Sequence, residues 1–396
     1  RDRSKQYHNV KTQLFRKDVS EIIIATDAGR EGELVARWIL DKSGCHKPIR
    51  RLWISSVTDK AIKEGFAHLK DGRAYNDLYH AARSRAEADW LVGINATRAL
   101  TCKYNAQLSC GRVQTPTLAM IAHREQQIRS FKPEDYYGLR CTTSVTGGSV
   151  GTMASIVTWT WQQKKSGSLR SFNKELITGL DKKLKNQTLT VTDVHTSSKR
   201  TPSPGLYDLT ELQRDANKRF GFSAKETLNI MQSLYEHHKV LTYPRTDSRY
   251  IGTDIVPTIK ERLKACNIGP YKKYIPELLK KPLKTSKAFV DDKKVSDHHA
   301  IIPTEEYVQL EHMSNNERKI YDLVVRRFIS VLYPAFEYEQ TTLKAEAAGE
   351  TFTAKGKVIK AAGWKAVYAD AASSGSSASQ YDAYGDYEDS EDFGED

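Results

Sequence analysis

A tyrosine followed by proline and then arginine is the arrangement with the clearest potential for covalent chemistry. Residues 241–248 read Leu-Thr-Tyr-Pro-Arg-Thr-Asp-Ser. The proline disfavours a helix at Tyr243, so we expect extended backbone in which Tyr243 and Arg245 point the same way. A phenol with a pKa of about 10 is a poor nucleophile at neutral pH. We expect the arginine to lower that pKa and to hold a phosphate, with Arg249 presenting a second guanidinium beside them. A surface turn between two helices fits the same residues, because Pro and Asp are common in turns.

A second candidate site follows a predicted strand near the N-terminus. Residues 21–25 read Glu-Ile-Ile-Ile-Ala, a run typical of a strand buried on both faces of a parallel sheet. Residues 26–33 read Thr-Asp-Ala-Gly-Arg-Glu-Gly-Glu and lead into a helical pattern. Such a strand-turn-helix unit binds ligands at the carboxyl end of its strand. Asp27 and Glu31 could hold Mg²⁺ together with phosphate oxygens, or could simply complement the dipole of the helix.

A third motif precedes a helix that we expect to begin near residue 114. Residues 108–116 read Leu-Ser-Cys-Gly-Arg-Val-Gln-Thr-Pro. Small residues, a threonine and a proline are typical of a helix N-terminus, where phosphate can bind. Arg112 and Gln114 could contact a nucleic-acid backbone, although an ordinary capped helix with a solvated arginine fits as well. We expect Leu118 and Ile121 to face inward.

A histidine pair lies within residues 297–304, which read Asp-His-His-Ala-Ile-Ile-Pro-Thr. Such a pair is usually structural or solvated, and no metal-binding spacing accompanies this one. Beside a phosphate-transfer site, however, an imidazole can donate a hydrogen bond to phosphate or move a proton.

The periodicity of the remaining residues predicts several domains. A second strand-helix unit is expected from residue 49, a helical region at 77–129, and alternating strands within 131–200 and 340–359. We therefore predict a multidomain fold: an α/β region, helical regions, and an antiparallel β domain with an inserted helical domain that bears the tyrosine. The predicted boundaries are 1–76 (partial Rossmann-like domain), 77–131 (helical), 132–204 and 316–368 (β domain), 205–315 (inserted helical domain) and 369–396 (acidic disordered tail).

The charge of the chain points to a polyanionic partner. The 396 residues include 61 Lys and Arg against 49 Asp and Glu, and the final 28 residues contain nine acids and no base. A body this basic favours nucleic acid first and an anionic membrane second. No apolar run is long enough to span a membrane and no secretory segment opens the chain, so we expect a soluble intracellular protein. Five scattered cysteines argue against a zinc ribbon or a disulfide framework.

Taken together, these motifs and their order resemble the type IA DNA topoisomerases, most nearly the bacterial topoisomerase III group. The resemblance includes residues 88–98, Ala-Asp-Trp-Leu-Val-Gly-Ile-Asn-Ala-Thr-Arg, and extends from about residue 15 to Tyr368. It implies a toroidal fold with a Toprim domain at the N-terminus, and an enzyme that relaxes or decatenates DNA without ATP. It also implies Mg²⁺ as cofactor, single-stranded DNA as partner, a monomer in the bacterial cytoplasm at the nucleoid, and a helicase among the partners the family suggests.

The resemblance assigns roles to individual residues. Tyr243 would attack a phosphodiester and form a 5′-phosphotyrosine, with Arg245 stabilising the phosphate and His298 assisting. Glu31 would be catalytic and would bind Mg²⁺ with Asp27. The residues implied to contact DNA are Ser109, Cys110, Gly111, Arg112, Val113, Gln114, Arg98, Trp90 and Arg245.

Three features depart from the family pattern. Gly29 stands where the family often has a second aspartate, no preceding strand supplies a catalytic glutamate, and the last part of the toroid is not found. We therefore expect a fragment that lacks the start of the Toprim domain and the C-terminal part. Two alternatives remain: a truncated DNA-binding relative without turnover, and another Toprim enzyme such as a nuclease or primase. The tyrosine and Gly-Arg-Val-Gln motifs count against the latter.

Overall fold

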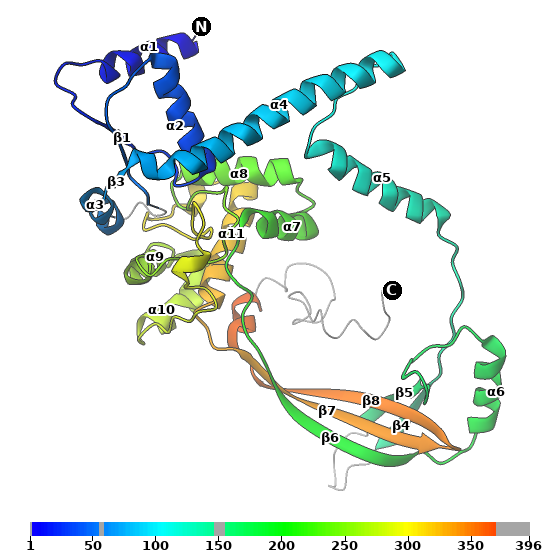
Figure 1. The fold of residues 1–396 in the computed structure, drawn as a ribbon. Helices are drawn as coiled ribbons and strands as arrows, with labels where there is room; N and C mark the ends of the chain where they lie inside the picture. The colour runs from blue at the N-terminus through cyan, green and yellow to red at the C-terminus, as the bar shows by residue number, and fades with distance from the viewer. Residues whose placement is uncertain (1, 55–58, 146–154, 370–396) are drawn as a thin grey trace. The chain divides into compact units, whose positions relative to one another are not determined.

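The computed structural model describes residues 2–54, 59–145 and 155–369 (Figure 1). The chain forms two compact units. Unit 1 contains residues 1–130 and 205–328, and unit 2 contains residues 131–204 and 329–396. Each unit is therefore built from two separate stretches of chain. The acidic tail from residue 370 onward lies outside the described residues, and the finer division into domains stays a prediction.

Unit 1 begins with a small α/β region. Its elements are α1 (Asp2–Leu14), β1 (Ile22–Ile24), α2 (Arg30–Ser43), β2 (Ile49–Arg51), α3 (Asp59–Ala67) and β3 (Lys70–Asp71). Strand β2 pairs in parallel with β1 and antiparallel with β3. Leu14, Ile24 and Leu40 form a core between α1, β1 and α2. The expectation that β1 is buried on both faces is wrong for Ile23, which is 38% exposed, because this core covers only one face of the strand.

Two long helices, α4 (Asn76–Tyr104) and α5 (Gln114–Ser130), follow this region. Helix α4 packs against α2, whereas α5 contains no buried residue. The prediction that Leu118 and Ile121 face inward is wrong, since they are 65% and 56% exposed. Helical periodicity located the helix correctly, but no described residue covers its apolar side.

The second stretch of unit 1 is mainly helical. Its helices are α7 (Leu209–Phe220), α8 (Ala224–Glu236), α9 (Ile259–Ala265), α10 (Ile275–Leu279) and α11 (Asn315–Ser330). Asp208 and Ser223 accept hydrogen bonds from backbone N–H groups in the first turns of α7 and α8, which fixes where each helix begins. Leu212 of α7, Met231 of α8 and Ile320 of α11 are fully buried, and Figure 1 shows these three helices close together.

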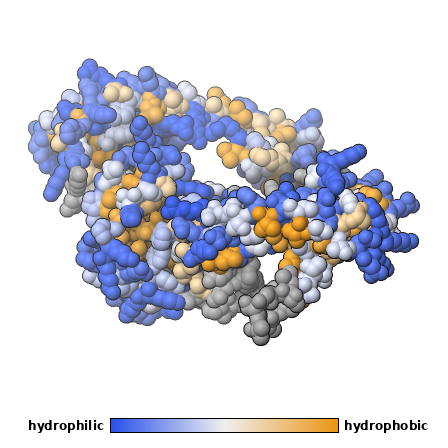
Figure 2. Space-filling view, turned by 90° about the horizontal axis from the view of Figure 1, so that it is seen from below, coloured by the Kyte–Doolittle hydropathy of each residue, from blue (hydrophilic) through white to orange (hydrophobic). Residues whose placement is uncertain are grey.

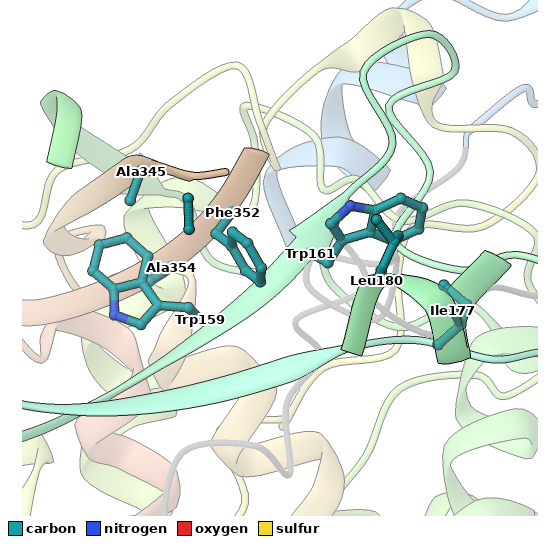
Figure 3. Close-up of a cluster of buried hydrophobic side chains, with 8 residues drawn as sticks. Trp159, Trp161, Ile177, Leu180, Ala345, Phe352 and Ala354 are labelled. Carbon is teal, nitrogen blue, oxygen red and sulfur yellow. The ribbon is translucent and has the colours of Figure 1, made fainter. Parts of the chain in front are cut away.

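Unit 2 is built around an antiparallel sheet, whose described strands follow the order β4-β5-β8-β7-β6. The strands are β4 (Arg140–Val145), β5 (Ser155–Gln162), β6 (Thr190–Thr201), β7 (Phe336–Ala347) and β8 (Glu350–Ala361), with α6 (Lys174–Leu184) beside them. One face of the sheet packs Trp159, Trp161 and Phe352 against Ile177 and Leu180 of α6 (Figure 3). Strand β8 runs without interruption through the last part of the alternating region expected at 340–359.

The surface is mostly polar. The face in Figure 2 is largely hydrophilic, with apolar side chains in separate patches. Among the described residues, no helix has the length and apolar content needed to cross a membrane.

The packing of unit 2 predicts that two positions of β8 contribute very differently to the stability of the unit. Phe352 is 2% exposed inside the tryptophan cluster, and Val358 is 58% exposed on the same strand. Phe352→Ala should lower the free energy of unfolding of unit 2 by about 3–5 kcal/mol, because it removes apolar burial and leaves a cavity. Val358→Ala should change it by less than about 0.5 kcal/mol. Chemical denaturation followed by tryptophan fluorescence measures both; equal losses would contradict the assignment of the core.

Candidate active site

The acidic turn between β1 and α2 is held in a tight conformation by its own backbone. The Gly29 N–H donates to the Asp27 carbonyl at 2.8 Å, and the Thr26 hydroxyl donates to the Gly32 carbonyl at 2.9 Å. A Cβ atom at Gly32 would lie 2.2 Å from the Asp27 carbonyl oxygen, so only glycine fits there. The Asp27 and Glu31 side chains are 64% and 69% exposed. The turn therefore presents two carboxylates to solvent from a fixed backbone.

A buried arginine lies beneath this turn. The Arg51 guanidinium donates to the carbonyls of Ile24 at 3.1 Å, Thr26 at 2.8 Å and Asp27 at 2.5 Å. Its side chain is fully buried, as is that of Glu33, and their charged atoms lie 2.9 Å apart. Burial lowers the pKa of Arg51, and the Glu33 carboxylate opposes this shift. One side chain thus satisfies the carbonyls at the end of β1 and orients the backbone of Asp27.

The tyrosine segment runs beside the histidine segment. Leu241 and Pro303 form an isolated antiparallel bridge. The Thr242 N–H donates to the Ile302 carbonyl at 3.0 Å, and the Thr246 hydroxyl donates to the His298 carbonyl at 3.0 Å. As expected from Pro244, Tyr243 is not helical. These bonds place the tyrosine opposite the histidine pair.

Tyr243 lies at the centre of the group that the structure brings together. Its ring centroid is 4.3 Å from that of His298 and 5.5 Å from that of Tyr235. His298 Nε2 is in turn 3.8 Å from Asp27 Oδ2. Tyrosine, histidine and the acidic turn therefore meet although they are far apart in the sequence.

The expected lowering of the tyrosine pKa is wrong. Burial raises the pKa of Tyr243, and the Asp27 carboxylate raises it further. Arg245 acts in the opposite direction, but one exposed guanidinium does not outweigh burial and a facing carboxylate.

Arg249, whose guanidinium was expected beside the tyrosine, forms ion pairs with other residues instead. Arg249 lies 2.9 Å from carboxylate oxygens of both Asp208 and Glu211 at the start of α7. Arg245 is exposed, and no carboxylate within the described residues pairs with it. Arg245 is therefore the arginine of this segment that remains free for a phosphate.

The two histidines of the pair have different surroundings. His298 is half-buried against Tyr243, whereas His299 turns into the protein and its Nδ1 lies 2.7 Å from the Ala300 carbonyl. Burial lowers the pKa of His299, which favours its neutral form. The geometry therefore selects His298 as the histidine that faces the tyrosine.

The helix that leads to the tyrosine is anchored by a carboxylate of α11. The Ser233 hydroxyl of α8 donates to Glu317 Oε1 at 2.6 Å, and His238 Nε2 lies 3.3 Å from the same oxygen. Burial raises the pKa of Glu317, but hydrogen bonds from Ser233 and Ser314 and the nearby His238 outweigh it and lower the pKa to about 2. This contact fixes the end of α8, just before the chain enters the bridge at Leu241.

The loop between α4 and α5, residues 109–114, packs on α4. The Cys110 N–H donates to Thr97 Oγ1 at 3.0 Å. The Arg112 guanidinium, expected to contact DNA, forms an ion pair with Asp89 of α4, with an Nη2–Oδ2 distance of 3.1 Å. DNA would therefore have to compete with Asp89 for Arg112. Trp90 is 65% exposed and Arg98 is exposed on the same helix.

The donor chemistry at the acidic turn fits a hard divalent cation. Mg²⁺ usually takes one or two carboxylates from a protein and completes its shell with water and phosphate oxygens. Asp27 and Glu31 provide exposed oxygens, although Glu31 also lies 3.2 Å from Arg85. Among the described residues, no group of three or more acidic, histidine or cysteine side chains is arranged to hold a metal. The turn thus fits a cation that is bound partly by the substrate.

Two features of the site were not found from the sequence. The sequence does not predict that Arg51 is buried, because an arginine at the end of a strand usually reaches solvent. Asp297 precedes His298 in the sequence, which does not predict that its carboxylate lies against Gly29 of the acidic turn. Burial raises the pKa of Asp297, and the carboxylates of Asp247 and Asp27 add to this effect against His298 and Arg30.

Comparison with known proteins identifies the family of the chain. A family model described as DNA topoisomerase matches residues 73–387, and the chain belongs to the type IA class of that family. DNA topoisomerase 3 of Bacillus cereus is 63% identical over 364 residues, and its Bacillus subtilis counterpart is 60% identical. Each alignment covers 92% of this chain, but 48% and 49% of the relative, so the chain spans about half the length of the curated relatives it matches.

A solved structure supports the fold. Full-length topoisomerase I from Thermotoga maritima matches with a TM-score of 0.63 at 23% sequence identity. The match covers 92% of this chain and 57% of that protein. The mixed helices and sheets of the chain therefore follow a type IA topoisomerase fold.

The buried ion pair of Arg51 and Glu33 predicts a large loss of stability when Glu33 is neutralised. Glu33→Gln should leave Arg51 buried without its partner and lower the free energy of unfolding by about 3–5 kcal/mol. Glu87→Gln breaks an exposed ion pair with Arg83 and is the matched control, with almost no expected change. Thermal unfolding of the two variants checks this; equal stability of both would show that the buried pair does not support the turn.

The contact between Glu317 and α8 predicts a pH-dependent stability. Because the pKa of Glu317 in the folded protein, about 2, lies below the usual value of about 4.3 in an unfolded chain, its charged form stabilises the fold above that value. The stabilisation is lost as the pH falls toward 2. Glu317→Gln should therefore lower the melting temperature at pH 7, and the difference from wild type should shrink below pH about 4.5. Glu311→Gln, at an exposed position nearby, is the control; a pH-independent effect of Glu317→Gln would contradict an origin in the charge of this carboxylate.

Proposed function

We propose that this chain carries the strand-cleaving site of a topoisomerase III-like enzyme that acts on single-stranded DNA. The proposal is supported chiefly by the meeting of Tyr243, His298 and Asp27, which come from segments far apart in the sequence. Membership of the type IA family makes a nuclease or primase the poorer explanation. A non-catalytic DNA-binding relative remains an outcome of the test below.

In the proposed reaction, the Tyr243 oxygen attacks a backbone phosphorus and the bond from phosphorus to the 3′ oxygen breaks. The tyrosine loses its proton, the leaving 3′ oxygen gains one, and a 5′-phosphotyrosine remains. One phosphate ester bond replaces another, so no ATP is needed to reseal the strand. Passage of another strand through the break would give relaxation or decatenation.

The neighbouring residues have complementary tasks. Arg245 stabilises the negative charge of the phosphate during its transfer. Its guanidinium is exposed and has no carboxylate partner among the described residues. The raised pKa of Tyr243 means that the phenol is protonated before attack, so a proton acceptor is required. We assign the transfer of that proton to His298, because its ring is in contact with that of Tyr243.

The acidic turn would hold Mg²⁺ through Asp27 and Glu31. A bound magnesium ion supplies positive charge that offsets both the carboxylates and the DNA phosphate. The residues proposed to guide the strand are those of the loop at 109–114 with Trp90 and Arg98 on α4, where an exposed ring can stack on a base. In this proposal, residues 1–76 form the Toprim part and residues 205–315 the tyrosine-bearing domain of the toroid.

Covalent trapping tests the proposal. Wild-type protein, Mg²⁺ and a single-stranded oligonucleotide labelled at its 3′ end are mixed and then denatured; the expected adduct retains the label, because tyrosine joins the 5′ end of the downstream fragment. Tyr243→Phe should abolish the adduct. Tyr250→Phe, whose hydroxyl lies 3.2 Å from Lys294 Nζ away from this group, should retain it. An adduct that survives Tyr243→Phe would refute the nucleophile, and salt-sensitive binding without any adduct would leave a DNA-binding relative.

A further inference from the structure

The sheet of unit 2 has a polar face on the side away from its core. Successive side chains of a strand point to opposite faces, and Phe352 and Ala354 of β8 belong to the cluster that packs against α6 (Figure 3). Thr353, Lys355 and Lys357 therefore point to the other face, which we call the polar face. Lys355 and Lys357 are exposed there.

The strand register extends the polar face over the neighbouring strands. Residues that lie directly opposite each other on paired strands share a face. Lys344 of β7 lies opposite Thr353 of β8, and further pairs continue the same face to β6 on one side and to β5 and β4 on the other. The basic members of the polar face are Arg140, Lys199, Lys344, Lys355 and Lys357. Its uncharged polar members include Thr160, Ser197, Gln340, Thr342 and Thr353.

On the face toward α6, by contrast, basic side chains lie close to carboxylates. Three ion pairs lie on that side: Lys360 with Glu339 at 2.9 Å, Arg200 with Glu337 at 3.3 Å, and Lys183 with Glu350 at 3.4 Å. Each of these cations is therefore neutralised locally by an acid of the same unit.

On the polar face, cations outnumber acids. Within its strands as the structure describes them, the acids are Asp193, which lies 3.9 Å from Lys344, and Glu346, which lies 3.3 Å from Lys164. No described carboxylate forms an ion pair with Lys355. Positive charge is thus concentrated on one side of the sheet, and such a concentration attracts a polyanion.

The polar face offers little surface for base stacking. The aromatic residues on the described strands of this face are Phe336, which is 1% exposed, and Tyr338, whose ring centroid lies 4.2 Å from Lys357 Nζ. Surfaces that bind single-stranded nucleic acid combine cations with exposed rings on which bases stack. Lysine, threonine and glutamine side chains without such rings suit phosphate groups instead. A duplex fits this chemistry better than a single strand, because its phosphates lie outside and its bases are already paired.

We infer that the polar face of the unit 2 sheet binds the sugar–phosphate backbone of duplex DNA. The inference goes beyond the proposed function, which concerns the single strand that is cleaved at Tyr243 in unit 1. Lys344 and Tyr338, the residue opposite Lys199, are six positions apart on β7, so the cations extend over about 20 Å along the strands. A duplex of about that length carries about twelve phosphates, which is enough to engage every cation of the face.

Lysine footprinting of the full chain tests the inference at individual residues. The protein is acetylated briefly with and without a short blunt DNA duplex, in EDTA so that no strand is cleaved, and mass spectrometry measures each lysine. Acetylation of Lys355 and Lys357 should fall about threefold or more in the presence of duplex, because bound phosphates cover them. Lys183 and Lys360, which lie toward α6, should react equally in both samples and are the internal controls.

Charge removal gives the second arm of the test. The combined variant Lys344→Gln, Lys355→Gln and Lys357→Gln should weaken duplex binding about tenfold or more at low salt, and should reduce the slope of log affinity against log salt by about two to three units. The control variant Lys174→Gln, Lys183→Gln and Lys360→Gln removes the same charge from the α6 side. It should change affinity by less than about threefold, because salt screens charges that do not touch the DNA.

Several results would overturn the inference. They are equal protection of the lysines on the two faces, equal losses of affinity in the two triple variants, or stronger protection of Lys355 and Lys357 by a single strand than by a duplex. The footprint uses wild-type protein, so its result stands even where a variant unfolds, and melting temperatures identify such a variant.

The same variants separate this inference from the proposed function. Covalent trapping through Tyr243 uses a single-stranded oligonucleotide, so the triple variant of the polar face should still form the adduct. Protection of Lys355 and Lys357 by duplex in a protein that forms no adduct would overturn the cleavage mechanism and leave the duplex-binding surface standing.

Discussion

The site depends on one constraint: negative charges meet at the place where we propose that a phosphate also binds. Asp27 faces the tyrosine, Asp297 lies against Gly29, and the DNA backbone would add a further anion. Carboxylates and phosphate repel each other unless cations lie between them. Arg245 near the tyrosine, with Arg30 and Arg85 beside the acidic turn, are positively charged side chains that the described residues bring to this place. Burial is the main cause of the raised pKa of Tyr243, and the facing Asp27 carboxylate adds to it.

This arrangement requires a rigid support, because the like-charged groups would otherwise move apart. Beneath the acidic turn, the buried Arg51 donates hydrogen bonds to four backbone carbonyls and pairs with Glu33. On the other side, hydrogen bonds between the tyrosine and histidine segments fix Tyr243 opposite His298. A buried ion pair is costly to desolvate, but once formed it holds a single geometry. The repulsion between the carboxylates of the site is thus opposed by the contacts of Arg51 and by the hydrogen bonds between the tyrosine and histidine segments.

Local features of the site could be predicted from the sequence, and contacts between distant segments could not. The β-branched run at 22–24 and the acidic turn are encoded by neighbouring residues, and Pro244 excludes a helix at Tyr243. The pKa of Tyr243 was predicted with the wrong sign, because the sequence shows the adjacent arginine but not the burial or the facing Asp27. Arg249 and Arg112 were expected to be free, yet each has a carboxylate partner on another element. The approach of Asp297 to Gly29 depends on the whole of unit 1 and has no signal in either local sequence.

The division of unit 2 into two stretches has a consequence for the order in which the protein folds. Strand β6 ends at Thr201, and β7, its hydrogen-bonded neighbour, begins only at Phe336. A ribosome that adds about 5–20 residues per second needs on the order of ten seconds to make the residues between them. During that interval the β4–β5 hairpin and β6 have no β7 or β8 to pair with, while the tyrosine-bearing helices can already pack. The sheet can therefore be completed only after the helical insertion has been made, and until then its unpaired strand edges are exposed to wrong pairing.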